Sequence, residues 1–120
     1  MSKAALIVGA GDATGGAIAK AFAREGYVAC VNRRARNADQ LEALAQSIRD
    51  EGYKAHAYPA DARIEDDVVA MVDAIERDVG PIEVAVFNIG ANVNFSVLDM
   101  TAQVYRKVWE IAAFAGFLMA

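Results

Sequence analysis

The sequence predicts an α/β fold in which a parallel sheet carries helices on both of its faces. Four short apolar segments alternate with longer segments whose apolar residues recur at helical spacing, and this alternation is typical of parallel sheets. The first apolar segment, residues 4–8, is continuous, as in a strand covered on both sides, and a glycine-rich turn follows it directly. Right-handed crossovers then predict the strand order 3-2-1-4, with a cleft above the first and fourth strands, where the order reverses.

The first half of the chain is predicted to contain two strands and two helices. A helix follows the glycine-rich turn and ends at Gly26, and the second strand covers residues 27–31. A second helix, capped by Asn37 or Asp39, ends at Gly52. Each strand is thus followed by a helix that returns the chain to the start of the next strand.

The second half repeats this alternation. A weaker third strand covers residues 53–58, and a third helix follows Asp61 and ends at Gly80, before a proline. The fourth strand covers residues 82–87. Its composition is typical of an interior strand, although the predicted order places it at an edge. Thr101 is predicted to cap a last helix that runs to residue 120.

Composition narrows the class of protein. The chain has 120 residues, of which 56% are hydrophobic, so it forms a globular domain or part of one. The net charge of −4 disfavours a nucleic-acid partner. The single cysteine, Cys30, points to a reducing compartment, and no apolar run reaches the roughly 18 residues that a membrane helix needs. We therefore expect a cytoplasmic protein with no membrane partner.

The glycine-rich turn is the strongest candidate for a ligand site. A strand enters it and a helix leaves it, so the bare amides and partial positive charge of the helix start are available to a pyrophosphate. Glycines allow the sharp turn and a close approach of the backbone to a ligand. The alternative is that they serve only the turn. Neither the strict G-x-G-x-x-G pattern nor the Walker pattern fits, because Thr14 occupies the third position of the former and no Gly-Lys pair occurs.

These features resemble the N-terminal half of a short-chain dehydrogenase/reductase. The turn of that family reads Gly-x-x-x-Gly-x-Gly; Gly9 and Gly15 match its first and last glycines, and Ala13 occupies the middle position. The resemblance implies that residues 1–120 are a Rossmann-like NAD(P)-binding half-domain, incomplete relative to the family's seven-stranded domain. The cofactor-binding residues predicted on this basis are Gly9, Gly11, Asp12, Ala13, Thr14, Gly15, Arg33, Arg34, Asp61, Ala62, Asn88 and Gly90.

The segment after the second strand predicts which cofactor binds. Arg33 lies where NAD-using relatives carry an aspartate for the ribose hydroxyls, and Arg34 adds a second guanidinium. Guanidinium groups match phosphate geometry, so NADP is preferred and NAD is the less favoured cofactor. Asp12 opposes this assignment, because many NADP-using relatives have Lys or Arg there. The alternative for the arginines is a solvated surface run.

Two further segments match the family pattern. Asp61 and Ala62 fall on its Asp-Val pair after the third strand, and the resemblance implies that Asp61 borders the adenine ring; alternatively it only starts the turn into the third helix. Asn88 and Gly90 fall on its Asn-Asn-Ala-Gly segment. In relatives that segment steadies the sheet and forms the floor of the cofactor cleft.

The catalytic residues of the family are not found in this sequence. Its chemistry depends on a serine and on a Tyr-x-x-x-Lys pair, which the family pattern places beyond residue 120. The residues four positions after the tyrosines Tyr27, Tyr53, Tyr58 and Tyr105 are Val31, Ala57, Ala62 and Trp109. Ala112 stands where relatives carry an asparagine that holds a proton-relay water. We expect the chain to be a fragment or a truncated product, without catalytic residues of its own.

Three functions remain open. The first is the cofactor-binding half of an oxidoreductase that transfers hydride between NADP(H) and a carbonyl or alcohol substrate. The second is a non-catalytic NADP-binding or interaction protein. The third is a phosphoacceptor receiver-like domain with Asp61 as the acceptor. Against this third function, the present sequence lacks the acidic pair that receiver domains carry after the first strand. The uncapped apolar C-terminal segment, residues 111–120, predicts a homo-oligomer formed through the last helix.

Overall fold

The computed structural model describes residues 2–11, 13–89 and 95–120. Its sheet has the order β3-β2-β1-β4, and all neighbouring strands are parallel. The strands are β1 (Ala4–Val8), β2 (Val28–Asn32), β3 (Ala55–Ala57) and β4 (Ile82–Phe87). The predicted parallel sheet and strand order are confirmed. Because the order reverses between β1 and β4, the carboxyl ends of these strands mark the position where open α/β sheets bind ligands.

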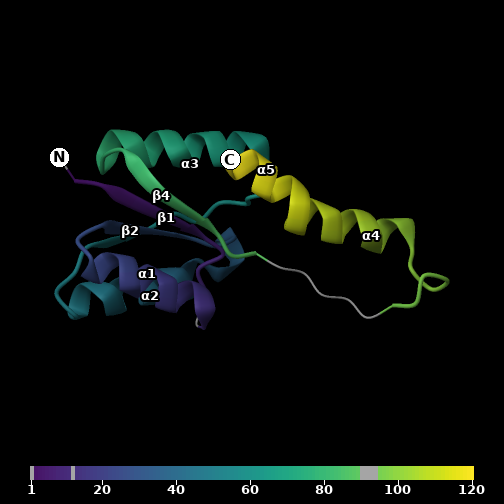
Figure 1. The fold of residues 1–120 in the computed structure, drawn as a ribbon, viewed down its shortest axis with the longest axis horizontal. Coiled ribbons are helices and arrows are strands. Elements are labelled where there is room, and N and C mark those ends of the chain that lie inside the picture. The colour runs from purple at the N-terminus through teal and green to yellow at the C-terminus, as the bar shows by residue number, and fades with distance from the viewer. Residues whose placement is uncertain (1, 12, 90–94) are drawn as a thin grey trace.

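Helices cover both faces of the sheet, as predicted. The helices are α1 (Thr14–Arg24), α2 (Ala38–Asp50), α3 (Glu65–Asp78), α4 (Ala102–Trp109) and α5 (Ala115–Met119). A short 3₁₀ turn, Ala35–Asn37, precedes α2, and a π-helical turn, Glu110–Phe114, joins α4 to α5. Figure 1 shows α1 and α2 on one side of the sheet, and α3 with α5 on the other.

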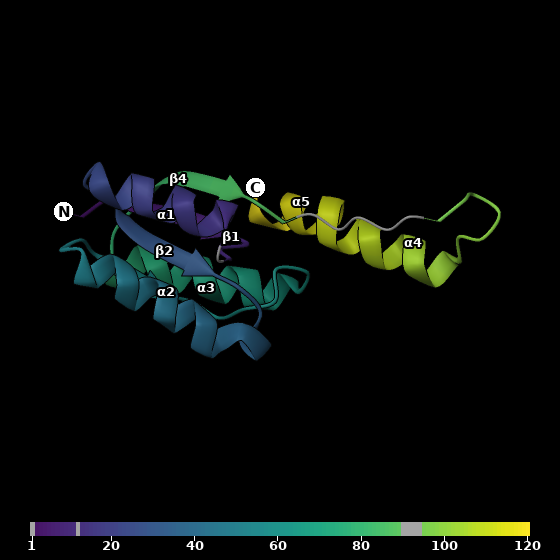
Figure 2. The same cartoon turned by 90° about the horizontal axis from the view of Figure 1, so that it is seen from below.

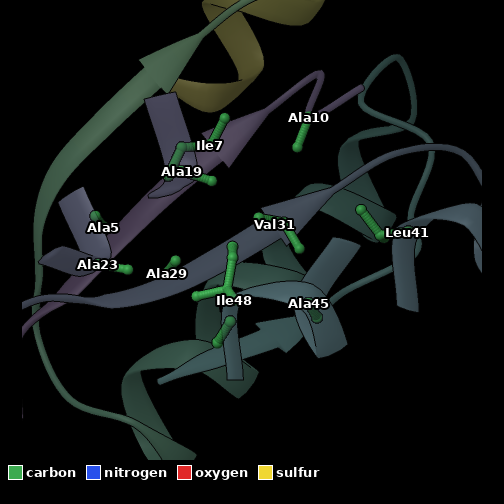
Figure 3. Packing of buried hydrophobic residues seen from close by; sticks show 11 residues of the cluster. Ala5, Ile7, Ala10, Ala19, Ala23, Ala29, Val31, Leu41, Ala45 and Ile48 are labelled. Carbon is green, nitrogen blue, oxygen red and sulfur yellow. The ribbon is translucent and has the colours of Figure 1, made fainter. Parts of the chain in front are cut away.

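The face under α1 and α2 is closely packed. Small residues of α1, such as Ala19 and Ala23, let that helix approach the strands, while Ile48 of α2 fills the space beside Val31. Figure 3 shows these side chains converging on the sheet. All five residues of β1 are buried because both of its faces are covered, which explains its continuous apolar sequence.

The face under α3 is closed by larger side chains. Leu6 and Cys30 of the strands pack in the same cluster as Met71 and Ile75 of α3, and Ala115 of α5 completes it. Burial raises the pKa of the Cys30 thiol to about 12. This thiol is therefore protonated near neutral pH and packs as a small apolar side chain.

The C-terminal helix extends beyond the sheet. In Figures 1 and 2, α5 lies near α3 while α4 projects away from the sheet, and the molecule is 52 Å long but only 26 by 22 Å across. Thr101 caps α4, since its Oγ1 accepts a hydrogen bond from the Val104 N–H at 3.2 Å. This confirms the predicted cap. Tyr105, Trp109 and Phe117 are exposed along this helix, and self-association through it stays a prediction.

Several boundaries differ from the sequence predictions. The second strand includes Asn32, whose side chain is held by buried hydrogen bonds, and the third is shorter than residues 53–58. Asn37 is the N-cap residue of α2 but makes no side-chain cap bond. β4 lies at the edge of the described sheet, with half-buried and exposed residues alternating over Ile82–Val86, so its apolar composition does not reflect full burial.

No helix in the described part of the chain combines the length and the apolar character required to cross a bilayer.

Candidate functional site

The turn between β1 and α1, with the first residues of that helix, requires glycine at three positions: Gly9, Gly15 and Gly16, since a Cβ on Gly16 would lie 2.6 Å from the carbonyl oxygen of Gly11. Gly9 has φ +86°, and a Cβ added to it would lie 2.5 Å from the carbonyl oxygen of Asn88. A Cβ on Gly15 would overlap the carbonyl oxygen of Gly9. The turn therefore packs backbone against backbone, and only glycine fits at these points. Gly11 has open space around its Cα, so sterics do not demand glycine there.

The start of α1 is a suitable anion site. Its N-cap residue is Ala13, whose side chain cannot accept a hydrogen bond, and Ala13 and Thr14 are exposed. The first amides of a helix have no partner within the helix and carry its partial positive charge. Asp12 and Gly90, two of the predicted cofactor-binding residues, lie outside the described residues.

Asn32 links three segments at the carboxyl edge of the sheet. Its side-chain amide donates to the carbonyl oxygens of Tyr58, at 2.9 Å, and Ala60, at 3.2 Å. The backbone carbonyl oxygen of Asn32 accepts hydrogen bonds from the backbone N–H groups of Gly9 and Ala10. The residue is buried, so these bonds satisfy polar groups that would otherwise be costly there. Sequence reasoning did not select Asn32; the available signal was a polar residue ending an apolar strand.

Asn88 ties the end of β4 to the glycine turn. Its backbone N–H donates to the carbonyl oxygen of Val8 at 2.8 Å, and its Nδ2 donates to that of Gly9 at 3.3 Å. The bonds join the ends of β1 and β4 at the point where the sheet order reverses. Asn88 therefore has the structural role, linking neighbouring backbones, that its position suggested.

A hollow of about 200 Å³ opens at the carboxyl ends of β1 and β2. Its lining joins the turn, the segment after β2, the segment after β3 and the C-terminal helix. The lining residues are Gly9, Asn32, Arg33, Arg34, Asn37, Ala60, Asp61, Ala62, Arg63, Ile89, Ile111 and Ala115.

Five of the predicted site residues meet in this hollow: Gly9, Arg33, Arg34, Asp61 and Ala62. The other described ones, Gly11, Ala13, Thr14, Gly15 and Asn88, do not line it. They belong to the turn, to the first residues of α1 and to the end of β4. The site thus has two parts, a hollow and a glycine turn, which share Gly9.

An ion pair dominates the electrostatics of the hollow. Arg63 Nη2 lies 2.7 Å from Asp61 Oδ2, and Arg63 Nε donates to Asp61 Oδ1 at 3.0 Å. This side-chain hydrogen bonding holds the pKa of the Asp61 carboxyl below its ordinary value and raises the pKa of Arg63. The nearby charge of Arg34 also lowers the Asp61 pKa. Sequence reasoning missed Arg63, because nothing local marks it as a partner of Asp61.

The two arginines after β2, unlike Arg63, form no ion pair among the described residues. Arg33 Nη1 donates to the neutral Oε1 of Gln40 at 3.0 Å. Within the described residues, neither Arg33 nor Arg34 has a carboxylate partner. Both are half-buried and line the hollow, so they contribute positive charge to its wall. The same described ranges contain no group of three or more His, Cys, Asp or Glu that could hold a metal ion.

A parallel sheet, a glycine turn at its reversal point and a cationic hollow beside it define the Rossmann-like nucleotide-binding class. The chain belongs to the short-chain dehydrogenase family, because the profile of that family matches residues 3–120. The predicted resemblance is confirmed, and a receiver-like domain is thereby disfavoured.

Individual relatives agree with this assignment. The crystal structure of a short-chain dehydrogenase from Rhodopseudomonas palustris is 43% identical, with a TM-score of 0.90 over 98% of this chain and 54% of that one. Gluconate 5-dehydrogenase from Gluconobacter oxydans is 38% identical over 88% of this chain and 39% of its own length. L-Sorbose reductase from Gluconobacter frateurii, solved with NADPH and L-sorbose, is 26% identical, with a TM-score of 0.90 over 99% of this chain and 45% of that one.

The chain spans about half the length of these relatives, or less. Ala112, which the family resemblance predicts to stand in place of a relay asparagine, is an exposed residue of the π-helical turn. The sequence contains no Tyr-x-x-x-Lys pair of the family type.

Proposed function

We propose that this chain is the NADP(H)-binding half of a short-chain dehydrogenase/reductase that transfers hydride between NADP(H) and a carbonyl or alcohol substrate. One observation carries the proposal: the glycine turn shares Gly9 with a hollow whose arginines Arg33 and Arg34 lack carboxylate partners among the described residues. A dinucleotide has a pyrophosphate for the turn and, in NADP, a ribose phosphate for the arginines. NADPH in the L-sorbose reductase structure supports this choice of cofactor.

The turn fits a pyrophosphate. The chain folds tightly over the start of α1 because glycine occupies the positions at which a Cβ would collide with backbone: Gly9, Gly15 and Gly16. The backbone N–H groups of Ala13, Thr14 and Gly15, at the start of α1, are the donors that we assign to the phosphate oxygens. The N–H groups of Gly9 and Ala10 hold the turn itself, because they donate to the backbone carbonyl oxygen of Asn32.

The hollow fits the adenosine end. Arg33 and Arg34 are assigned to the 2′-phosphate, because guanidinium groups bind phosphate with paired N–H donors. Asp61 and Ala62 are assigned to the base, and Asn88, which ties the end of β4 to Gly9, is assigned to the floor of the cofactor cleft. When bound, NADP(H) supplies the hydride; the residues of this chain bind the cofactor, orient it and place its reactive end over the carboxyl ends of β1 and β4.

A titration of NADPH and NADH into the protein, followed by calorimetry, tests the cofactor assignment. We expect NADPH to bind at least about tenfold more tightly, since a paired guanidinium–phosphate contact contributes about 1.5–3 kcal/mol. Arg33→Asp should remove or reverse the preference. Arg36→Asp is the matched control: this arginine is exposed in the same segment but does not line the hollow. Equal affinity for the two cofactors in the wild-type protein would contradict the NADP assignment.

A non-catalytic NADP-binding protein is the second candidate, and Ala112 favours it, because the relay asparagine is replaced. The two candidates differ in turnover. NADPH oxidation by the full-length product with a panel of ketones and aldehydes supports the oxidoreductase, and tight NADPH binding without oxidation supports the second candidate.

A further inference from the structure

Asp61 is an unexpected residue in a hollow that takes a phosphate. It is the one carboxylate among the described lining residues, and it faces the same space as Arg33 and Arg34. A bare carboxylate at such a position would repel a second anion, and the repulsion would be strong because partly buried charges are poorly screened. The charge of Asp61 therefore has to be compensated before the hollow can take a phosphate monoester.

Arg63 supplies that compensation. The side chains form two parallel hydrogen bonds, at 2.7 and 3.0 Å, and the backbone N–H of Arg63 donates a third to Asp61 Oδ1 at 3.0 Å. Both carboxylate oxygens are thus occupied by donors from one residue. The side chains are only 28% exposed for Arg63 and 19% for Asp61. The pair is held in place by Asp67, whose Oδ2 accepts a hydrogen bond from the Asp61 backbone N–H at 3.1 Å.

The charges of the hollow then separate into two groups. Arg63 and Asp61 cancel each other, and Glu110 is the other carboxylate whose charge acts on Arg63. Arg33 and Arg34 remain, without carboxylate partners in the described parts of the chain. The net positive charge that the hollow offers to a ligand therefore depends on the Asp61–Arg63 ion pair, even if Arg63 itself does not contact the ligand.

We propose that Arg63 determines the specificity of the hollow for a phosphorylated adenosine ribose by neutralising Asp61. This inference deepens the proposed function and rests on it. Arg63 is a positioning residue here: it acts through the carboxylate of Asp61, and it is distinct from Arg33 and Arg34, which are assigned to the phosphate itself.

Two probes isolate the effect. Adenosine 2′,5′-bisphosphate and 5′-AMP share the adenosine and the 5′-phosphate and differ only in the 2′-phosphate. With the wild-type protein, calorimetry should give tighter binding of the bisphosphate. Arg63→Ala should weaken the bisphosphate about tenfold, the loss expected for a ligand charge that gains one uncompensated like charge nearby. The same variant should leave 5′-AMP nearly unchanged, and Arg63→Lys, which keeps the charge, should retain most of the preference.

The second variant distinguishes neutralisation from direct contact. Asp61→Asn removes the repelling charge, so the double variant Asp61→Asn/Arg63→Ala should recover most of the lost bisphosphate affinity. If the double variant binds the bisphosphate as weakly as Arg63→Ala, Arg63 contacts the phosphate itself and the inference is wrong. If Arg63→Ala weakens both probes equally, the residue only braces the segment, which also overturns the inference. A wild-type protein without preference for the bisphosphate would overturn the NADP assignment and, with it, this inference; circular dichroism verifies that each variant is folded.

Discussion

Helices α1 and α2 bury their apolar residues against the sheet, whereas the C-terminal helix, α4 with α5, leaves large apolar residues exposed. Ile48 of α2 has no exposed surface, whereas Phe117 of α5, a larger apolar side chain, is 73% exposed. The difference lies in the partner surface. Ile48 faces β2 and β3, while α5 packs beside α3 through Ala115 and Met119 and α4 projects away from the sheet (Figures 1 and 2). Phe117 does not belong to that cluster. Hydrophobicity alone does not decide burial; a packed surface opposite the residue does.

The strands show the same contrast. Every residue of β1 and β2 is buried, but β4 alternates between half-buried and exposed positions over Ile82–Val86. Exposed Glu83 pairs with Lys3 at 3.4 Å, a surface contact that contributes little to stability. The described edge of the sheet therefore depends less on packing than its centre does.

Truncation of the buried Ile48 side chain should give the largest change in the free energy of unfolding. Ile48→Ala removes packing from a closed cluster and should lower the free energy of unfolding by about 2–5 kcal/mol. Phe117→Ala deletes a larger but exposed side chain and should change it by less than about 0.5 kcal/mol. Urea denaturation followed by far-ultraviolet circular dichroism measures both. A loss for Phe117→Ala as large as that for Ile48→Ala would show that the C-terminal helix packs on a surface in solution.

The glycine turn offers a second comparison within the well-packed region. Gly9 and Gly26 both have positive φ, but only Gly9 has backbone within contact of an added Cβ. Gly26→Ala should cost about 1–2 kcal/mol for the left-handed backbone, and Gly9→Ala about 1–3 kcal/mol more for the clash. Thermal unfolding measures the two variants side by side. Equal losses would mean that the turn can move away from Asn88.

The starts of α3 and α4 allow a smaller, stabilising change. Thr101 caps α4, whereas the N-cap residue of α3 is Ile64, which is 48% exposed and makes no cap bond. Ile64→Thr should add a cap and raise the free energy of unfolding by about 0.5–2 kcal/mol. Ile64→Val is the matched control, because valine has the shape of threonine without its hydroxyl. The cap explanation fails if both variants gain equally in urea denaturation.

The sequence predicts most of the site because its signals are local. Gly9 and Gly15 stand at fixed distances from a strand end, and Arg33 follows directly after another strand. Asn32 and Arg63 were missed for a different reason. Asn32 acts on Tyr58 and Ala60, which are 26 and 28 positions away, and no sequence spacing marks such a contact. Arg63 is close to Asp61 in sequence, but each of these side chains can adopt several rotamers. Only the folded structure shows that they adopt the rotamers that form the ion pair.

By itself, then, the order of residues determined the alternation of strands and helices, the β3-β2-β1-β4 arrangement and the position of the glycine turn, because each depends on periodicity, chirality or a conformation that only glycine adopts. The tertiary structure alone decided which charges in the hollow cancel, which polar side chain holds the carboxyl edge of the sheet together, and which apolar side chains stay at the surface. The last two outcomes depend on distances between segments far apart in the chain, which no local sequence pattern specifies. The first depends on the rotamers that Asp61 and Arg63 adopt in the folded hollow.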